Sequence, residues 1–159
     1  MESNAEASQK VAQSVELYAD MVFRIAYQNM GQKADAEDVV QDVFLKLMSA
    51  PDFTSQEHCK AWLIRVTINR CKDLHRSAWR SRTQTFDDLE IPVETNHKDV
   101  LNEIFRLPPD DRTMIYLYYF EGYKVPEIAK MLEIKENTVS SRISRARKKL
   151  KGLLEGGDF

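Results

Sequence analysis

Residues 121–151, EGYKVPEIAKMLEIKENTVSSRISRARKKLK, determine the fold of the C-terminal half. A short helix is predicted over about Pro126 to Leu132, with the proline in the first turn, where it is tolerated. After a tight turn, a second helix is predicted from about Glu136 to Leu153 or Leu154. Its apolar residues are spaced four and three residues apart and therefore share one face: Val139, Ile143, Ala146, Leu150 and Leu153.

The opposite face of this second helix is polar and basic. Between Lys135 and Lys151 there are seven Lys or Arg residues and one acid, Glu136. A short helix, a turn and a second helix with a polar beginning and a basic end form the helix-turn-helix arrangement. In that arrangement the start of the second helix meets base edges, while nearby cations neutralise phosphates. The alternative is a solvated basic helix on an ordinary helical protein; we prefer DNA binding.

Composition bounds the rest of the chain. With 159 residues it can hold one ordinary domain or two small ones, and 30% charged residues with five glycines and five prolines favour an all-α fold. The net charge of −2 conceals segregated charges. Residues 35–42 hold four acids and no base, residues 60–82 seven bases and one acid, and residues 87–99 five acids and one lysine. We therefore expect separate acidic and basic surfaces.

Cys59 and Cys71 are too few for a disulfide framework. No apolar run approaches the roughly 20 residues that span a bilayer, and the N-terminus has no secretory hydrophobic segment. We expect a cytoplasmic protein that inserts into no membrane, so that any membrane association would come from a partner.

Three helices are predicted before residue 81. The first runs from about residue 8 to Met30 and stops at Gly31. Asp35 is the predicted cap of the second, which ends before Pro51, and Ser55 that of the third, about residues 57–80. The predicted core faces of the first two helices are Val11, Val15, Tyr18, Val22 and Ile25, and then Ala36, Val39, Val40, Val43, Phe44 and Leu47.

The periodicity lapses between residues 81 and 97, which are acidic, polar and interrupted by Pro92. This segment is predicted to be a flexible acidic linker between two small helical domains, residues 8–80 and residues 98–155. The second domain is predicted to contain helices over about Asp99 to Leu107 and about Asp110 to Phe120, followed by the helix-turn-helix.

The third predicted helix carries a stripe of cations, an amide and an indole, spaced three and four residues apart: Trp62, Arg65, Asn69, Lys72 and Arg76. These groups suit nucleic acid, because cations bind phosphates, a flat ring stacks on an unstacked base and an amide reads a base edge. The alternative is that Trp62 belongs to the core and that the cations are merely solvated.

Two clusters suggest a metal site and are better explained otherwise. The acids Asp35, Glu37, Asp38 and Asp42 begin a helix, where the helix dipole favours them, and form a docking surface for a basic partner. His58, Cys59, Cys71 and His75 suggest a zinc site, but no CxxC pair accompanies them. We therefore interpret the cysteines as structural residues. No grouping of serine, cysteine or histidine residues suggests a catalytic nucleophile with its base. We expect no metal, no cofactor and no catalytic activity.

Two stretches together resemble one protein family. DAEDVVQDVFLKL (residues 35–47) followed by WLIRVTINRCKDLHR (residues 62–76) resembles region 2 of the sigma factors of bacterial RNA polymerase. RLPPDDRTMIYLYYFEGYKVPEIAKMLEIKENTVSSRISRARKKL (residues 106–150) resembles their region 4. The order, and the linker in place of a middle domain, are similar to the small extracytoplasmic-function (ECF) group.

The resemblance implies roles for the first domain. Region 2 docks on the clamp helices of the polymerase β′ subunit, here through Asp38, Gln41 and Asp42. The loop at residues 53–58 and the stripe on the next helix would open and read the −10 promoter element.

The resemblance also implies that region 4 reads the −35 element through the second helix of the helix-turn-helix and docks on the β flap. Residues expected to face bases are Asn137, Ser140, Ser141, Ser144 and Arg145; those expected to hold phosphates are Arg112, Lys135, Thr138, Arg142 and Arg147. Glu133 stands where glycine is usual and Lys135 where a serine cap is common, so we expect a turn conformation that tolerates a side chain. Ser140 and Ser144 also depart from the family, so its −35 base preference does not transfer.

The implied function is that of a promoter-specificity subunit, bound to core RNA polymerase and promoter DNA, with no small-molecule substrate. An anti-sigma factor is the expected further partner, and it could hold the protein at a membrane. One alternative is a free-standing helix-turn-helix regulator that acts without polymerase, although no dimer helix is evident. Another is a metal-dependent nucleic-acid enzyme built on residues 35–42.

Overall fold

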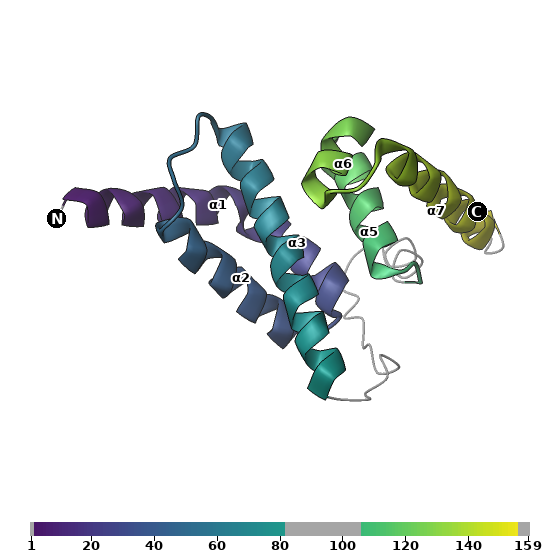
Figure 1. Cartoon of the computed structure of the whole chain (residues 1–159), viewed down its shortest axis with the longest axis horizontal. Helices are drawn as coiled ribbons and strands as arrows, with labels where there is room; N and C mark the ends of the chain where they lie inside the picture. The colour runs from purple at the N-terminus through teal and green to yellow at the C-terminus, as the bar shows by residue number, and fades with distance from the viewer. Residues whose placement is uncertain (1, 82–105, 156–159) are drawn as a thin grey trace. The chain divides into compact units, whose positions relative to one another are not determined.

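The computed structural model describes residues 2–81 and 106–155, and all regular elements in these two ranges are helices (Figure 1). The all-α prediction is thereby confirmed. The predicted linker and most of the helix predicted from Asp99 lie outside the described residues. None of the helices in the two ranges has the length and hydropathy that a membrane crossing requires.

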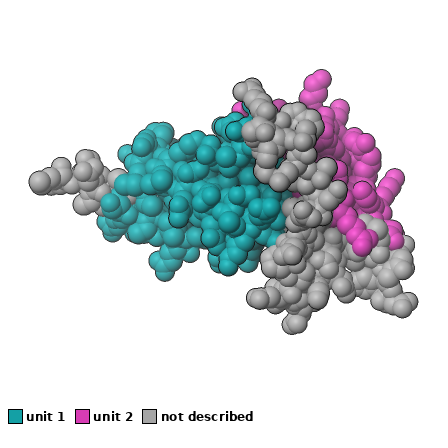
Figure 2. All heavy atoms as spheres, turned by 90° about the horizontal axis from the view of Figure 1, so that it is seen from below, with its two compact units in different colours: residues 1–89 teal, residues 90–159 magenta. Residues whose placement is uncertain are grey.

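The chain separates into two compact units, Met1–Leu89 and Glu90–Phe159, which Figure 2 colours teal and magenta. The finer limits at residues 80, 81, 97 and 98 stay predictions.

The first unit consists of α1 (Glu2–Met30), α2 (Lys33–Met48) and α3 (Gln56–Ser81), and each of these helices packs against the other two. Apolar side chains at helical spacing form the core between them, as the periodicity predicts. Thr67 joins this core because its hydroxyl donates a hydrogen bond of 2.6 Å to the Leu63 carbonyl. The fully buried side chains include Val22, Ile25, Val39, Val43, Leu47, Leu63 and Ile64.

The first half of α1 differs from the prediction. The helix begins at Glu2 rather than near residue 8, and Val15, a predicted core residue, is 39% exposed. Ser14 is the buried residue there, with its hydroxyl 3.8 Å from the Cys59 sulfur. This half of the helix packs against the beginning of α3 rather than against the apolar core. A small polar residue, Ser14, is therefore buried in place of the neighbouring Val15. The predicted stop is confirmed: Gly31 has φ 77° and donates to the Tyr27 carbonyl.

The two predicted caps in this unit have different outcomes. The prediction for Asp35 is wrong, because α2 already begins at Lys33 and Asp35 lies inside its first turn, where the helix dipole still favours a carboxylate. The prediction for Ser55 is confirmed, because its hydroxyl oxygen accepts a 3.1 Å hydrogen bond from the His58 amide. Val40, a predicted core residue, is only half-buried.

The second unit contains α5 (Pro109–Ile115), η2 (Tyr116–Phe120), α6 (Val125–Leu132) and α7 (Glu136–Glu155). The helix predicted over residues 110–120 therefore ends in a π turn, in which the Glu121 amide donates to the Tyr116 carbonyl at 3.2 Å. Leu117 in this turn is fully buried, whereas the three aromatic residues after it are exposed: Tyr118, Tyr119 and Phe120.

Candidate nucleic-acid interface

The helix-turn-helix is formed by α6 and α7, whose boundaries agree with the prediction to within one or two residues. Ile128 and Ala129 of α6 pack in the core that Val139, Ile143 and Ala146 of α7 share. The Glu127 carboxylate accepts a 3.1 Å hydrogen bond from the Lys124 amide and so closes the first turn of α6. Burial of one face of α7 leaves its other face to solvent.

The turn between the two helices contains a residue with left-handed backbone conformation, although that residue is not glycine. Glu133 has φ 58° and ψ 44°, and the next amide, that of Ile134, donates to the Ala129 carbonyl at 3.0 Å. This is the hydrogen bond of a Schellman motif, whose left-handed position usually holds glycine. The turn thus keeps the geometry in which glycine is usual, within the small left-handed region that a residue with a side chain can occupy at an energetic cost.

Nine of the ten residues predicted to bind the −35 element lie at the surface of the second unit. Thr138 and Arg142 are half-buried. Seven others are exposed: Lys135, Asn137, Ser140, Ser141, Ser144, Arg145 and Arg147.

Three arginines of α7 already have contacts within the unit. Arg142 lies 3.5 Å from the Asp110 carboxylate at the start of α5. The Arg147 guanidinium lies 5.9 Å from the centroid of the exposed Tyr119 ring, and Arg145 donates to the Ser141 carbonyl at 3.5 Å. These contacts leave Arg145 and Arg147 exposed and Arg142 half-buried, so all three cations stay accessible to solvent.

Arg112 is the exception among the predicted −35 residues. It is only 5% exposed, and burial lowers the pKa of its guanidinium. A side chain so enclosed has little surface to offer a phosphate, so its position gives no support to the −35 role of Arg112, which stays a prediction. The periodicity does not predict this burial, because α5, with seven residues, is too short to establish which of its faces is inward.

The stripe on α3 lies along the surface of the first unit. Arg65, Asn69 and Arg76 are exposed, whereas Trp62 and Lys72 are half-buried. The helix therefore buries its apolar arc and presents cations, an amide and part of an indole to solvent.

An aromatic cluster lies at the beginning of this stripe. The Phe53 ring, in the loop before α3, lies 5.6 Å from the Trp62 ring and 5.1 Å from the His58 ring, measured between centroids. The loop and the stripe, to which the resemblance assigns one function, are thus in direct contact.

The predicted docking residues on α2 divide into two kinds. Asp38 and Gln41 are exposed, whereas the Asp42 carboxylate accepts a 2.8 Å hydrogen bond from Arg70 of α3. Asp42 therefore joins two helices of its own domain. Leu45 and Met48, which were not singled out, are 63% and 47% exposed and continue the helical face of Asp38 and Gln41.

The described residues contain no group of three or more His, Cys, Asp or Glu side chains arranged to hold a metal ion. Both cysteines are free and buried, and burial raises the pKa of the Cys71 thiol to about 12. His75 meets the Asn29 carbonyl at 2.6 Å. The zinc alternative therefore has no support in the described residues.

Comparison with known proteins confirms the resemblance in both units. Residues 15–81 match the family described as Sigma-70 region 2, and residues 97–150 match Sigma-70, region 4. The chain is 32% identical over 138 residues to the ECF RNA polymerase sigma factor SigM of Mycobacterium tuberculosis, covering 82% of this chain and 70% of SigM. It is 31% identical over 153 residues to SigE of Mycolicibacterium smegmatis, covering 88% of this chain and 60% of SigE.

Solved structures have the same fold. The sigma factor RpoE, in complex with the anti-sigma factor NepR from Bartonella quintana, has a TM-score of 0.78 at 24% identity, covering 94% of this chain and 99% of RpoE. CnrH, in complex with the cytosolic domain of CnrY, has a TM-score of 0.69 at 27% identity, covering 98% and 97%.

Proposed function

Because this chain belongs to the ECF group of the sigma-70 family, we propose that it is a promoter-specificity subunit that directs core RNA polymerase to its start sites. One observation supports this best: each of the two units carries its own exposed surface with the chemistry of nucleic-acid binding. The first is the stripe on α3, and the second is the polar face of α7.

The polar face of α7 suits the major groove of the −35 element. Its exposed first turns carry Asn137, Ser140 and Ser141, small groups that can approach base edges closely. Arg145 lies one turn further on and is the one exposed guanidinium among the residues assigned to bases. Lys135, Arg142 and Arg147 are the proposed phosphate contacts.

The stripe on α3 suits the −10 element. The half-buried Trp62 ring offers an aromatic surface on which an unstacked base can lie, and Asn69 offers a donor and an acceptor to a base edge. Arg65, Lys72 and Arg76 would follow the phosphates. We propose that opening proceeds by trapping an unstacked base on this surface rather than by a catalytic step, so the protein needs no cofactor.

Two further surfaces suit the polymerase itself. On α2, Asp38 and Gln41 lie on one face with the exposed Leu45 and Met48, which gives an acidic and apolar surface for the β′ clamp helices. In the second unit, the exposed aromatic residues of η2 form an apolar surface that we assign to the β flap.

An anti-sigma factor is the remaining proposed partner. The support is the family itself, together with solved relatives held in complexes, one of them with the anti-sigma factor NepR. A cytoplasmic protein held by such a partner, which could itself sit at a membrane, is the arrangement we propose.

The test begins with retention of core RNA polymerase by the purified chain, followed by run-off transcription from genomic fragments of its host. We expect stoichiometric retention and new start sites that share −35 and −10 sequences. Trp62→Ala should keep closed complexes but reduce opening, measured by permanganate reactivity of thymines near −10. Arg24→Ala, an exposed cation on α1 outside the stripe, is the control.

A free-standing helix-turn-helix regulator is the alternative function, and the same experiment separates the two. It predicts tight binding to duplex DNA by the chain alone, in the form of a dimer on a palindrome. If core polymerase is not retained and such binding is found, the proposed function is wrong.

A further inference from the structure

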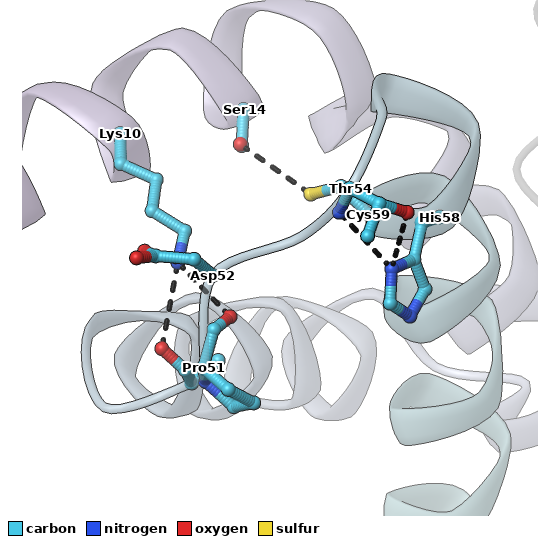
Figure 3. A network of polar contacts seen from close by, with 8 residues as sticks. Lys10, Ser14, Pro51, Asp52, Thr54, His58 and Cys59 are labelled. Atoms are coloured by element: carbon cyan, nitrogen blue, oxygen red, sulfur yellow. Dashed lines mark hydrogen bonds and ion pairs between the residues drawn. The ribbon is translucent and has the colours of Figure 1, made fainter.

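The loop between α2 and α3 is tethered by one lysine of α1. The Lys10 ammonium donates hydrogen bonds of 3.4 Å to the carbonyls of Ala50 and Pro51 and lies 3.9 Å from the Asp52 carboxylate (Figure 3). It also lies 4.8 Å from the centroid of the Phe53 ring. Four consecutive loop residues therefore share one cation, whose side chain is only 27% exposed.

The same face of α1 holds the other end of the loop. One turn after Lys10, the Ser14 hydroxyl lies 3.8 Å from the Cys59 sulfur, and one turn further the Tyr18 hydroxyl donates to the Gln56 carbonyl at 3.4 Å. Residues four apart lie on one face of a helix, so Lys10, Ser14 and Tyr18 form a continuous line of polar contacts.

Contacts between the loop and the first turns of α3 connect the tethered loop to the stripe. The Thr54 amide donates to His58 Nδ1 at 3.3 Å, and the Thr54 hydroxyl lies 3.3 Å from the same nitrogen (Figure 3). Phe53, beneath the Lys10 ammonium, packs against both His58 and Trp62. A displaced Phe53 would leave the Trp62 ring without one of its supports.

We propose that Lys10 is a positioning residue for −10 recognition: it holds the loop, and through Phe53 the Trp62 ring, in the shape that receives an unstacked base. This inference rests on the proposed function. A platform ordered before binding avoids the entropy cost of ordering it in the complex. Lys10 acts through the loop rather than on DNA, because its ammonium faces two carbonyls and a ring.

Two substitutions test the role of the charge. Lys10→Met keeps the length and apolar stem of the side chain but removes the cation, whereas Lys10→Arg keeps a cation that can donate to carbonyls and lie over a ring. Lys33→Met is the matched control, because Lys33 is an exposed lysine whose partner is Glu37 within its own helix. The readouts are hydrogen exchange of the amides of residues 49–58 in the free chain, retention of core polymerase and permanganate-detected opening.

For Lys10→Met we expect about tenfold faster amide exchange in the loop and about tenfold slower opening, since several weak contacts to one cation are lost together. Retention of core polymerase should change less than about twofold, because the α2 surface is untouched. Lys10→Arg should restore most of both effects, and Lys33→Met should match the parent in all three measurements.

The outcomes separate this inference from the proposed function. If Trp62→Ala slows opening while Lys10→Met does not, the inference is wrong and the proposed function stands. If neither substitution slows opening in polymerase complexes, the −10 assignment falls and the inference falls with it. If Lys10→Met slows opening without faster amide exchange in the loop, Lys10 does not act by ordering the loop and the positioning role is refuted.

Discussion

Glu133 occupies a backbone position that disfavours every side chain. Within the described residues it is the one non-glycine residue with positive φ, at 58°. A left-handed conformation brings Cβ close to the following carbonyl oxygen and costs roughly 1–2 kcal/mol for a residue other than glycine. Since the Schellman hydrogen bond from Ile134 requires this conformation, the strain persists in the folded protein.

Glu133→Gly should therefore stabilise the second unit. We expect a gain of about 1 kcal/mol in the free energy of unfolding, because relief of the left-handed strain exceeds the extra entropy of an unfolded glycine. Urea denaturation followed by circular dichroism measures it. Glu133→Ala, which keeps Cβ, is the matched control and should change stability little; equal gains from both would show that the charge, not the backbone, matters.

Arg145 is the residue at which a −35 base preference can be tested most directly. Its guanidinium is exposed on the face of α7 assigned to the major groove. If it contacts a base, Arg145→Ala should cost about 1–3 kcal/mol at the preferred sequence and relax the preference at one position. Selection of −35 sequences by the polymerase complex measures both effects. Arg147→Ala, a proposed phosphate contact, should instead weaken binding evenly; a preserved preference in Arg145→Ala would disprove the base contact.

Among the elements, α2 and α3 are joined by the ion pair of Asp42 and Arg70. The Asp42 and Arg70 side chains are 38% and 34% exposed, so solvent screens the pair in part. Asp42 was assigned to polymerase docking, but its carboxylate already has this partner at 2.8 Å. Its main role is therefore expected within the domain.

A double-mutant cycle tests that expectation. Asp42→Asn and Arg70→Met should each destabilise the first unit by about 0.5–1 kcal/mol, and the double variant by less than the sum. Thermal unfolding of the four proteins gives the coupling energy. Asp38→Asn, an exposed acid of the same helix, should leave stability unchanged but weaken retention of core polymerase. Additive losses for the pair would mean that the ion pair contributes nothing.

Helices differ in how well their positions could be predicted from the sequence. The boundaries of α6 and α7 were predictable because a long amphipathic pattern is framed by a proline and a turn. The first half of α1 was not, because its neighbours are the loop before α3 and Cys59 rather than an apolar core. Periodicity identifies an apolar face but not which segment covers it.

For the candidate site, the sequence predicted which residues lie at the surface better than it predicted their contacts. Long helices with one polar face placed the stripe on α3 and nine of the ten predicted −35 residues at the surface. Burial of Arg112 and the pairing of Asp42 with Arg70 depend on contacts between helices, which local spacing does not contain. The role of Lys10 depends on such contacts too, although the regular spacing of four residues from Lys10 to Ser14 and from Ser14 to Tyr18 is visible in the sequence.

At the scale of the whole molecule, the separation of charge along the chain governs how it meets DNA. The net charge is −2, yet the exposed face of α7 is basic. We expect the free chain to bind a duplex promoter weakly, because acids elsewhere repel the phosphates that α7 attracts. With at most about six phosphates neutralised, the logarithm of the binding constant should fall with the logarithm of salt concentration at a slope of roughly −3 to −5.

Neutralising the five acids between residues 87 and 99, by changing each to its amide, should raise the affinity of the free chain for a duplex several-fold at low salt. Fluorescence anisotropy over a salt series measures affinity and slope together. A control with the same change in charge replaces five exposed acids of the first unit: Glu6, Glu16, Asp20, Asp38 and Glu57. A larger gain from the first set would assign the repulsion to the acidic segment at residues 87–99. Equal gains would assign it to total charge, and no gain from either set would leave weak binding to be explained by the few contacts that α7 makes alone.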